Sequence, residues 1–262
     1  MRVAIIGTGY VGLTTGVCLS FIGHQVSCLD TDEAKIKALK DGHIPIYEPS
    51  LAELMEEARP NLTFTSSYAE VIPGAEVVFI AVGTPPTPSG APNLEYLSQA
   101  ARSVGQYLGG PFTVVVNKST VPIGSGNWVG SLLRDSVEQR PDKTRLEFAV
   151  ASNPEFLREG SALHDSLYPD RIVIGADEQR ALEVLYSLYR PILDQTFSAP
   201  TYLPRPETVV AVPLLSTDLA SAELIKYAAN AFLALKISYI NEIGQLAEKV
   251  GADIGQIGRA HV

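Results

Sequence analysis

The stretch VAIIGTGYVGLTTGVCLSFIGHQVSCLD, residues 3–30, decides the fold. The apolar run Val3 to Ile6 is typical of a buried strand, and the glycine pattern G-x-G-x-x-G of residues 7–12 follows it directly. A helical segment leads to a second apolar run, residues 25–29, and Asp30 stands at its end. The order of strand, glycine turn, helix, strand and acid predicts a β-α-β unit with a dinucleotide-binding fingerprint.

Each glycine of this pattern has a physical task. Gly7 lets the chain leave the strand in a tight turn, and Gly9 removes the Cβ that would block a pyrophosphate. Gly12 lets the helix pack close to the sheet, while the unpaired N–H groups at the helix start face the phosphates. Glycine is common in turns for geometry alone. The prediction of a cofactor site therefore depends on the surrounding strand, helix and acid.

The acid at the end of the second strand indicates which cofactor is bound. Asp30 lies 18 residues beyond Gly12, where a carboxylate accepts hydrogen bonds from ribose hydroxyls and repels a 2′-phosphate. Neither Thr31 nor Asp32 supplies an arginine that would reverse this choice, so we predict NAD rather than NADP. Lys35 either points back to the adenosine side of the cofactor or is a solvated helix lysine, and spacing alone leaves both open.

Composition excludes several classes of protein. The chain has 262 residues, of which 46% are hydrophobic and 19% charged, so it can bury a substantial core. Its formal net charge of −9 argues against a general nucleic-acid or membrane-surface binder. We find no apolar run long enough to span a bilayer and no signal peptide before the first strand, so we expect a cytoplasmic protein.

Neither the cysteines nor the histidines have the spacing of metal ligands. Cys18 falls in the first helix and Cys28 in the second strand, and both are expected to be small buried packing residues. The four histidines are scattered along the chain, so we predict no metal site.

Beyond Asp30, apolar strand patterns alternate with amphipathic helix patterns. This alternation predicts an α/β fold: a Rossmann-type doubly wound parallel sheet followed by a long central helix. The expected strands cover residues 62–65, 77–82, 112–117, 148–152, 172–175 and 209–212, and the expected helices cover 32–40, 51–58, 94–107, 125–137 and 178–189.

Three polar loops follow three successive strands of this predicted sheet. They comprise residues 83–88, 118–122 and 153–160. Because the carboxyl ends of parallel strands share one edge of a sheet, these loops should meet the glycine turn there. Ligands of open α/β sheets bind in that crevice.

The last part of the chain reads as one long helix over residues 217–250, apolar almost all round. Such a helix needs burial by a second domain or subunit. We expect a NAD-binding domain over residues 1–210 and a central helical region over 211–262. Lys226 and Asn230 lie four residues apart on one helix face, where they either act as a polar pair in a buried site or belong to an interface from which the lysine reaches solvent.

Taken together, these segments resemble the nucleotide-sugar dehydrogenases of the UDP-glucose/GDP-mannose dehydrogenase family. The matching segments follow the family's order over nearly the whole chain. They are GTGYVG at 7–12, YEP at 47–49, VGTP at 82–85, STVPIG at 119–124, NPEFLREGSA at 153–162, PDRIVIG at 169–175 and AELIKYAANAFLALKISYINE at 222–242.

The resemblance implies roles for individual residues. The backbone at Tyr10 and Val11 and the side chain of Asp30 would hold the cofactor, together with the glycine turn. Lys35, Thr84 and Thr120 would lie near the cofactor, and Glu159 would contact its nicotinamide end.

The resemblance also implies the residues that handle the sugar. Glu155, with Thr120, would position the water of a second half-reaction, and Phe156 and Leu157 would line the sugar site. Lys226 and Asn230 would stabilise the oxyanion that forms at C6, and Glu155 would share the substrate site with them. The long helix would be the core of a homodimer.

The family oxidises the C6 alcohol of a nucleotide-bound sugar to a carboxylate with two NAD, through an aldehyde and a cysteine thioester. PDRIVIG at 169–175 is similar to the branch that converts UDP-glucose to UDP-glucuronate, the sugar donor of polysaccharide synthesis. The alternatives are the GDP-mannose and UDP-N-acetylmannosamine branches, a related β-hydroxyacid dehydrogenase, and a non-catalytic NAD-binding fragment.

The chain departs from the family at its end. The family continues into a glycine-rich segment with the nucleophilic cysteine and then into a UDP-binding domain, and neither Cys18 nor Cys28 can replace that thiol. The last six residues, IGRAHV at 257–262, can be encoded by the start of a common sequencing adapter. We therefore expect a longer native protein, and an inactive chain as it stands.

Overall fold

The computed structural model describes residues 1–141 and 146–260. These residues form two compact units, 1–223 and 224–262, and each is described by itself. The expectation about the chain end extends to His261 and Val262, which lie outside the described residues. The domain division at residues 210 and 211 stays a prediction.

The first unit is built on one sheet, whose strands follow the order β3-β2-β1-β4-β5-β6-β7-β8. All neighbouring strands run parallel except β6 and β7. The strands are β1 (Arg2–Ile6), β2 (Gln25–Leu29), β3 (Leu62–Thr65), β4 (Val77–Ile80), β5 (Thr113–Asn117), β6 (Phe148–Ser152), β7 (Ile172–Ala176) and β8 (Leu214–Thr217).

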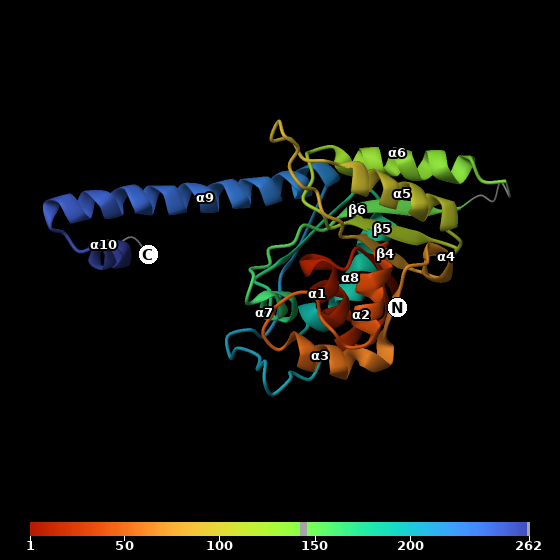
Figure 1. Cartoon of the computed structure of the whole chain (residues 1–262), viewed down its shortest axis with the longest axis horizontal. Helices are drawn as coiled ribbons and strands as arrows, with labels where there is room; N and C mark the ends of the chain where they lie inside the picture. Colours follow the sequence, from red (N-terminus) through yellow and green to blue (C-terminus); the bar gives the residue numbers. More distant parts are fainter. Residues whose placement is uncertain (142–145, 261–262) are drawn as a thin grey trace. The chain divides into compact units, whose positions relative to one another are not determined.

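Helices cover both faces of this sheet (Figure 1). Helices α1, α3 and α8 pack over one face around Leu13 and Val17, and α5 and α6 pack over the other around Leu97 and Val129. The doubly wound α/β fold is confirmed. The helices of this unit are α1 (Tyr10–Phe21), α2 (Glu33–Lys40), α3 (Leu51–Ala58), the 3-10 turn η1 (Arg59–Asn61), α4 (Tyr68–Val71), α5 (Glu95–Tyr107), α6 (Ser125–Glu138), α7 (Ala162–Leu167) and α8 (Gln179–Leu193).

The sheet reverses direction between β6 and β7. Their antiparallel register joins Ala151 to Ala176 and Ser152 to Gly175, which are the only two pairs in the described register. Strand β7 therefore begins beyond the carboxyl end of β6 and overlaps only its last residues. Strand β8 then runs parallel to β7 along the outer edge of the sheet.

Two predictions of secondary structure were wrong. The expected strand over residues 209–212 is a loop in which Val210 is 82% exposed, and the strand that pairs with β7 is Leu214–Thr217. An edge strand with little burial lacks the apolar run of a buried strand, so the apolar loop before it misled the prediction. Helix α8 also extends past Tyr189 to Leu193, although Pro191 inside it lacks the N–H that would bond to the preceding turn.

The second unit consists of most of α9 (Leu219–Val250), from residue 224 on, and α10 (Ile254–Ala260). Apolar side chains are prominent on the surface of α9, and Phe232, Leu233 and Leu235 are each more than half exposed. Of the helices that the structure describes, none is long and apolar enough to cross a membrane.

Candidate dinucleotide-binding site

The glycine turn between β1 and α1 is closely packed. Gly7 has φ +93°, which favours glycine, and its N–H donates to the Leu29 carbonyl at 2.7 Å. A Cβ on Gly12 would lie 1.9 Å from the carbonyl oxygen of Gly7, whereas a Cβ on Gly9 would meet no atom within 4 Å. The chain thus forms a tight turn whose one open position, at Gly9, faces the start of α1.

The Asp30 carboxylate lies beside this turn and is held in its ionised form. Its Oδ2 accepts hydrogen bonds from the Thr8 N–H at 2.9 Å, the Thr8 hydroxyl at 2.7 Å and the Lys35 ammonium at 2.8 Å. Burial alone would raise the pKa of Asp30, but these donors outweigh it and lower the pKa to about 2. Lys35 therefore turns back toward the glycine turn instead of extending into solvent.

A cavity of about 340 Å³ opens over these groups. Its walls come from the glycine turn, the end of β2, the loop after β4 and helix α5, and include Gly7, Gly9, Asp30, Lys35, Val82 and Gly83. The open space over Gly9 at the N-terminus of α1 fits the pyrophosphate of a dinucleotide. The ionised carboxylate in the same cavity fits its adenosine ribose. These residues therefore suit NAD.

The loops after β4 and β5 are tied to each other next to this cavity. The Thr84 hydroxyl donates to the Thr120 carbonyl at 2.9 Å, and the Ser119 hydroxyl donates to the Val82 carbonyl at 2.8 Å. The structure therefore brings Thr84 and Thr120 together, as their place at neighbouring strand ends predicted.

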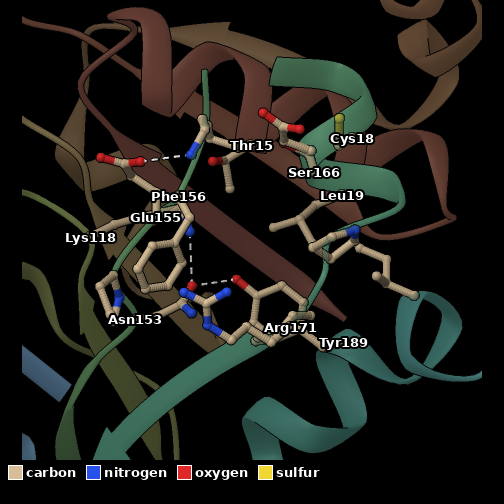
Figure 2. A pocket seen from close by; sticks show the side chains of 16 residues that line it. Thr15, Cys18, Leu19, Lys118, Asn153, Glu155, Phe156, Ser166, Arg171 and Tyr189 are labelled. Atoms are coloured by element: carbon tan, nitrogen blue, oxygen red, sulfur yellow. Dashed lines mark hydrogen bonds between the residues drawn. The ribbon is translucent and has the colours of Figure 1, made fainter. Parts of the chain in front are cut away.

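A second, smaller cavity of about 70 Å³ lies between α1, α8 and the loop after β6 (Figure 2). The buried Lys118 ammonium donates to the Asn153 side-chain oxygen at 2.9 Å, and the Tyr189 hydroxyl donates to the same oxygen at 2.6 Å. The Asn153 amide in turn donates to the Val173 carbonyl at 2.8 Å. This network joins the ends of β5, β6 and β7.

Residues 155–157 line the same small cavity. The Glu155 carboxylate accepts a hydrogen bond from the Leu157 N–H at 2.9 Å, which fixes the turn of the loop. The Arg171 guanidinium lies 4.5 Å from the centre of the Phe156 ring, a cation–π contact. Glu155, Phe156 and Leu157 are therefore held together at the end of β6.

Both cysteines are free and buried, as predicted. Cys18 borders the small cavity, and burial raises the pKa of its thiol to about 12. Burial does the same for Cys28. Thiols that stay protonated at neutral pH are poor nucleophiles and poor metal ligands. Within residues 1–141 and 146–260, no three His, Cys, Asp or Glu side chains gather as a metal site.

The predicted site residues thus fall into three groups in the first unit. The first group is the glycine turn, with Tyr10 and Val11 at the start of α1, together with Asp30 and Lys35 at the large cavity. The second is Thr84, which is hydrogen-bonded to Thr120. The third is residues 155–157, which line the small cavity. Glu159 is exposed on the loop after β6. Lys226 and Asn230 belong to the second unit, four residues apart on α9.

Sequence reasoning missed several residues of this region. Glu48 and Tyr189 are buried polar side chains that contact the site loops, and Asn153 binds Lys118. The YEP motif pointed to Glu48 but gave it no role. Nothing in the apolar pattern of α8 distinguishes Tyr189 from a packing residue.

The parallel sheet, glycine turn and acid-lined cavity define a Rossmann-type NAD-binding protein. The model described as "UDP-glucose/GDP-mannose dehydrogenase family, NAD binding domain" matches residues 1–193, and the model of the family's central domain matches residues 220–261. The chain belongs to the UDP-glucose/GDP-mannose dehydrogenase family. Its first 193 residues carry the NAD-binding domain of that family.

Relatives and solved structures agree with this assignment. The chain is 46% identical over 258 residues to the UDP-glucose 6-dehydrogenase TuaD of Bacillus subtilis, covering 98% of this chain and 51% of TuaD. It is 46% identical over 265 residues to the UDP-glucose 6-dehydrogenase of Rhizobium meliloti, covering 99% of this chain and 55% of that protein. The chain spans about half the length of the curated relatives it matches.

Among solved structures, a UDP-glucose dehydrogenase from Pyrobaculum islandicum superposes with a TM-score of 0.86 at 39% identity. A ternary complex of GDP-mannose dehydrogenase from Pseudomonas aeruginosa also gives a TM-score of 0.86, at 32% identity. Each match covers 99% of this chain and 56% of the other chain. The fold is thus shared by relatives whose names give different sugar nucleotides.

Proposed function

We propose that this chain is the NAD-binding and central part of a UDP-glucose 6-dehydrogenase, which oxidises UDP-glucose to UDP-glucuronate. The identity of 46% to two relatives named for that activity favours UDP-glucose over other nucleotide sugars. The observation that carries the cofactor assignment is the ionised Asp30 beside an open glycine turn. The activity itself is proposed for a full-length protein, because the matched relatives are about twice as long.

In this proposal the large cavity holds NAD, which accepts a hydride when bound. The N–H groups of Tyr10 and Val11 face the pyrophosphate at the start of α1. Asp30 accepts hydrogen bonds from the adenosine ribose, and Lys35 keeps that carboxylate ionised from 2.8 Å away. The negative charge of Asp30 also rejects the 2′-phosphate of NADP.

The loops after β5 and β6 would handle the sugar. Thr120 and Glu155 hold the water that hydrolyses the covalent intermediate, and Phe156 and Leu157 line the sugar site. Glu159 contacts the nicotinamide end of the cofactor. Lys226 and Asn230 of α9 stabilise the negative charge that develops at the sugar C6 oxygen, as a fixed ammonium and amide can do in a dry site.

Two properties of the isolated chain follow from the same proposal. Residues 1–262 should bind NAD without converting UDP-glucose to UDP-glucuronate, because neither thiol can act as the nucleophile that forms the thioester. Cys18 and Cys28 are both buried in the NAD-binding domain, with pKa values of about 12. The exposed apolar side chains of α9 support a homodimer formed through that helix.

The test has two stages. Titration of residues 1–262 with NADH and NADPH, followed by cofactor fluorescence, should show tighter binding of NADH. The full-length protein should then release two NADH per UDP-glucose, and fewer or none with GDP-mannose or UDP-N-acetylmannosamine. Tighter binding of NADPH would refute the role of Asp30, and preferred turnover of another sugar nucleotide would refute the substrate assignment. NADH binding with no turnover by the full-length protein would leave a binding module.

A further inference from the structure

Glu48 is a buried carboxylate between the glycine turn and the loop after β6. It lies in the segment that joins α2 to α3, and only 6% of its surface is exposed. Its Oε2 accepts hydrogen bonds from the Tyr10 hydroxyl and from the Gly160 N–H at 2.9 Å. Its Oε1 accepts the Leu163 N–H at 3.4 Å. A buried carboxylate is costly unless it is hydrogen-bonded, and these three donors supply its hydrogen bonds.

Tyr10 provides the link to the glycine turn. It is the first residue of α1, and its hydroxyl also donates to the Arg158 carbonyl at 3.3 Å and accepts the Gly160 N–H at 3.0 Å. Burial, and next the hydrogen bond to Glu48, raise the pKa of Tyr10 to about 12. The phenol therefore stays protonated at neutral pH and remains a donor to the carboxylate.

The loop after β6 is fixed at several points along its length. Asn153 anchors its start through the bonds to Lys118 and Tyr189. In the middle, the Arg158 N–H and guanidinium both donate to the Asp165 carboxylate, at 2.9 and 2.6 Å. At the end, Gly160 has φ +86° and is held by Glu48. Glu159 lies between the last two anchors.

From this arrangement we infer that Glu48 is a positioning residue that fixes the loop 155–160 relative to the glycine turn. The glycine turn carries the phosphate end of the cofactor site, and the loop carries Glu159, which the proposed function places at the nicotinamide end. The inference rests on that proposed function. Glu48 thereby sets the distance between the two ends of one bound cofactor without touching the cofactor itself.

The hydrogen bonds of Glu48 predict the effect of its substitution. All the partners of Glu48 are donors, so Glu48→Gln places an amide N–H against one of them at nearly unchanged volume. The amide oxygen that remains is also a weaker acceptor than a carboxylate oxygen, so the attachment of the loop end is weakened, while the contacts of Gly7 and Asp30 are unchanged. Ligands that need only the glycine turn should therefore tolerate the change, and ligands that also reach the loop should not.

The experiment compares NADH with ADP-ribose, which lacks the nicotinamide, on residues 1–262 by calorimetric titration. Glu48→Gln should lower the affinity for NADH by about tenfold, the equivalent of one net hydrogen bond, and the affinity for ADP-ribose by less than about twofold. Glu53→Gln makes the same charge change at an exposed position of α3 and should alter neither affinity. Tyr10→Phe removes only the phenol bonds and should lower NADH affinity in the same selective way.

If Glu48→Gln lowers the affinity for both ligands equally, the inference is overturned, because a general loss of structure acts on both. An unchanged affinity for NADH would overturn it as well. If Glu48→Gln does not fold, as judged by circular dichroism, Tyr10→Phe decides by the same ratio of affinities. A wild-type chain that binds neither ligand would instead refute the proposed function.

Discussion

The packing of the glycine turn leads to a prediction that separates cofactor binding from stability. A methyl group on Gly9 meets no protein atom within 4 Å, and the residue has φ −71°, which alanine readily adopts. Gly9→Ala should therefore change the free energy of unfolding by less than about 1 kcal/mol, the size of a helix-cap effect. The same methyl group occupies the space over which the pyrophosphate must approach, so NADH affinity should fall at least about tenfold.

Gly12→Ala is the matched contrast, with the same added methyl group three residues away. Its Cβ would lie 1.9 Å from the Gly7 carbonyl oxygen and 3.3 Å from the Ala81 Cβ. Backbone must move to relieve such a contact, because no flexible side chain can yield. Overpacking of this kind costs about 3 kcal/mol or more. This variant should lose both stability and NADH binding.

The assay is urea denaturation of residues 1–262 followed by circular dichroism, together with NADH titration of each variant. The reasoning requires the two variants to differ in stability while both lose affinity. Wild-type NADH affinity in Gly9→Ala would show that the cofactor does not cross the turn at that position. A Gly12→Ala variant as stable as Gly9→Ala would show that the turn relaxes more easily than its contacts indicate.

Three further predictions concern charge, thiols and association. Asp30→Asn should lower the preference for NADH over NADPH, measured by competitive titration. Because the pKa of Asp30 is lowered to about 2, its stabilising contribution is present above pH 3.8 and is lost as the pH falls through 2, so the difference in unfolding free energy between wild type and variant should shrink from pH 5 to pH 3. Burial raises the pKa values of Cys18 and Cys28 from 9.0 to about 12, so both thiols should resist alkylation in the folded chain at pH 8 and react once the chain is unfolded in urea. The stability that their neutral forms contribute should be lost as the pH rises from 9 to 12. Rapid labelling of either thiol in the folded chain would contradict this prediction. Leu235→Lys, at a position of α9 that is 64% exposed, should reduce self-association in light scattering, whereas Tyr186→Lys on α8 should not.

Much of the first unit could be predicted from the sequence, because its parallel strands are buried on both faces. Such strands are mostly continuous apolar runs, and β4 and β5, in which every residue is buried, lie within the predicted ranges 77–82 and 112–117. The edge strand β8 lacks that signal, since its burial is partial. The reversal between β6 and β7 depends on pairing between distant segments, and no local pattern encodes it.

The candidate site divides in the same way. Asp30 and the three glycines follow from spacing within one β-α-β unit, and the structure places Gly7, Gly9 and Asp30 on the wall of one cavity. Glu48 depends on partners 38 and 112 residues away, so its role becomes visible only in three dimensions. The role of Lys35 could not be predicted for a different reason. Its spacing from Asp30 is the same whether its side chain pairs with that carboxylate or extends into solvent.

The short register between β6 and β7 divides the sheet into two blocks that should open separately. Six parallel strands form one block, and β7 with β8 forms the other, joined to it by two residue pairs. Amide hydrogen exchange reports such differences in local opening. The free energy of the opening that exposes the amides of β7 and β8 to exchange should be lower than that for β1. The outer pair of strands would therefore separate first and the cofactor-binding strands last.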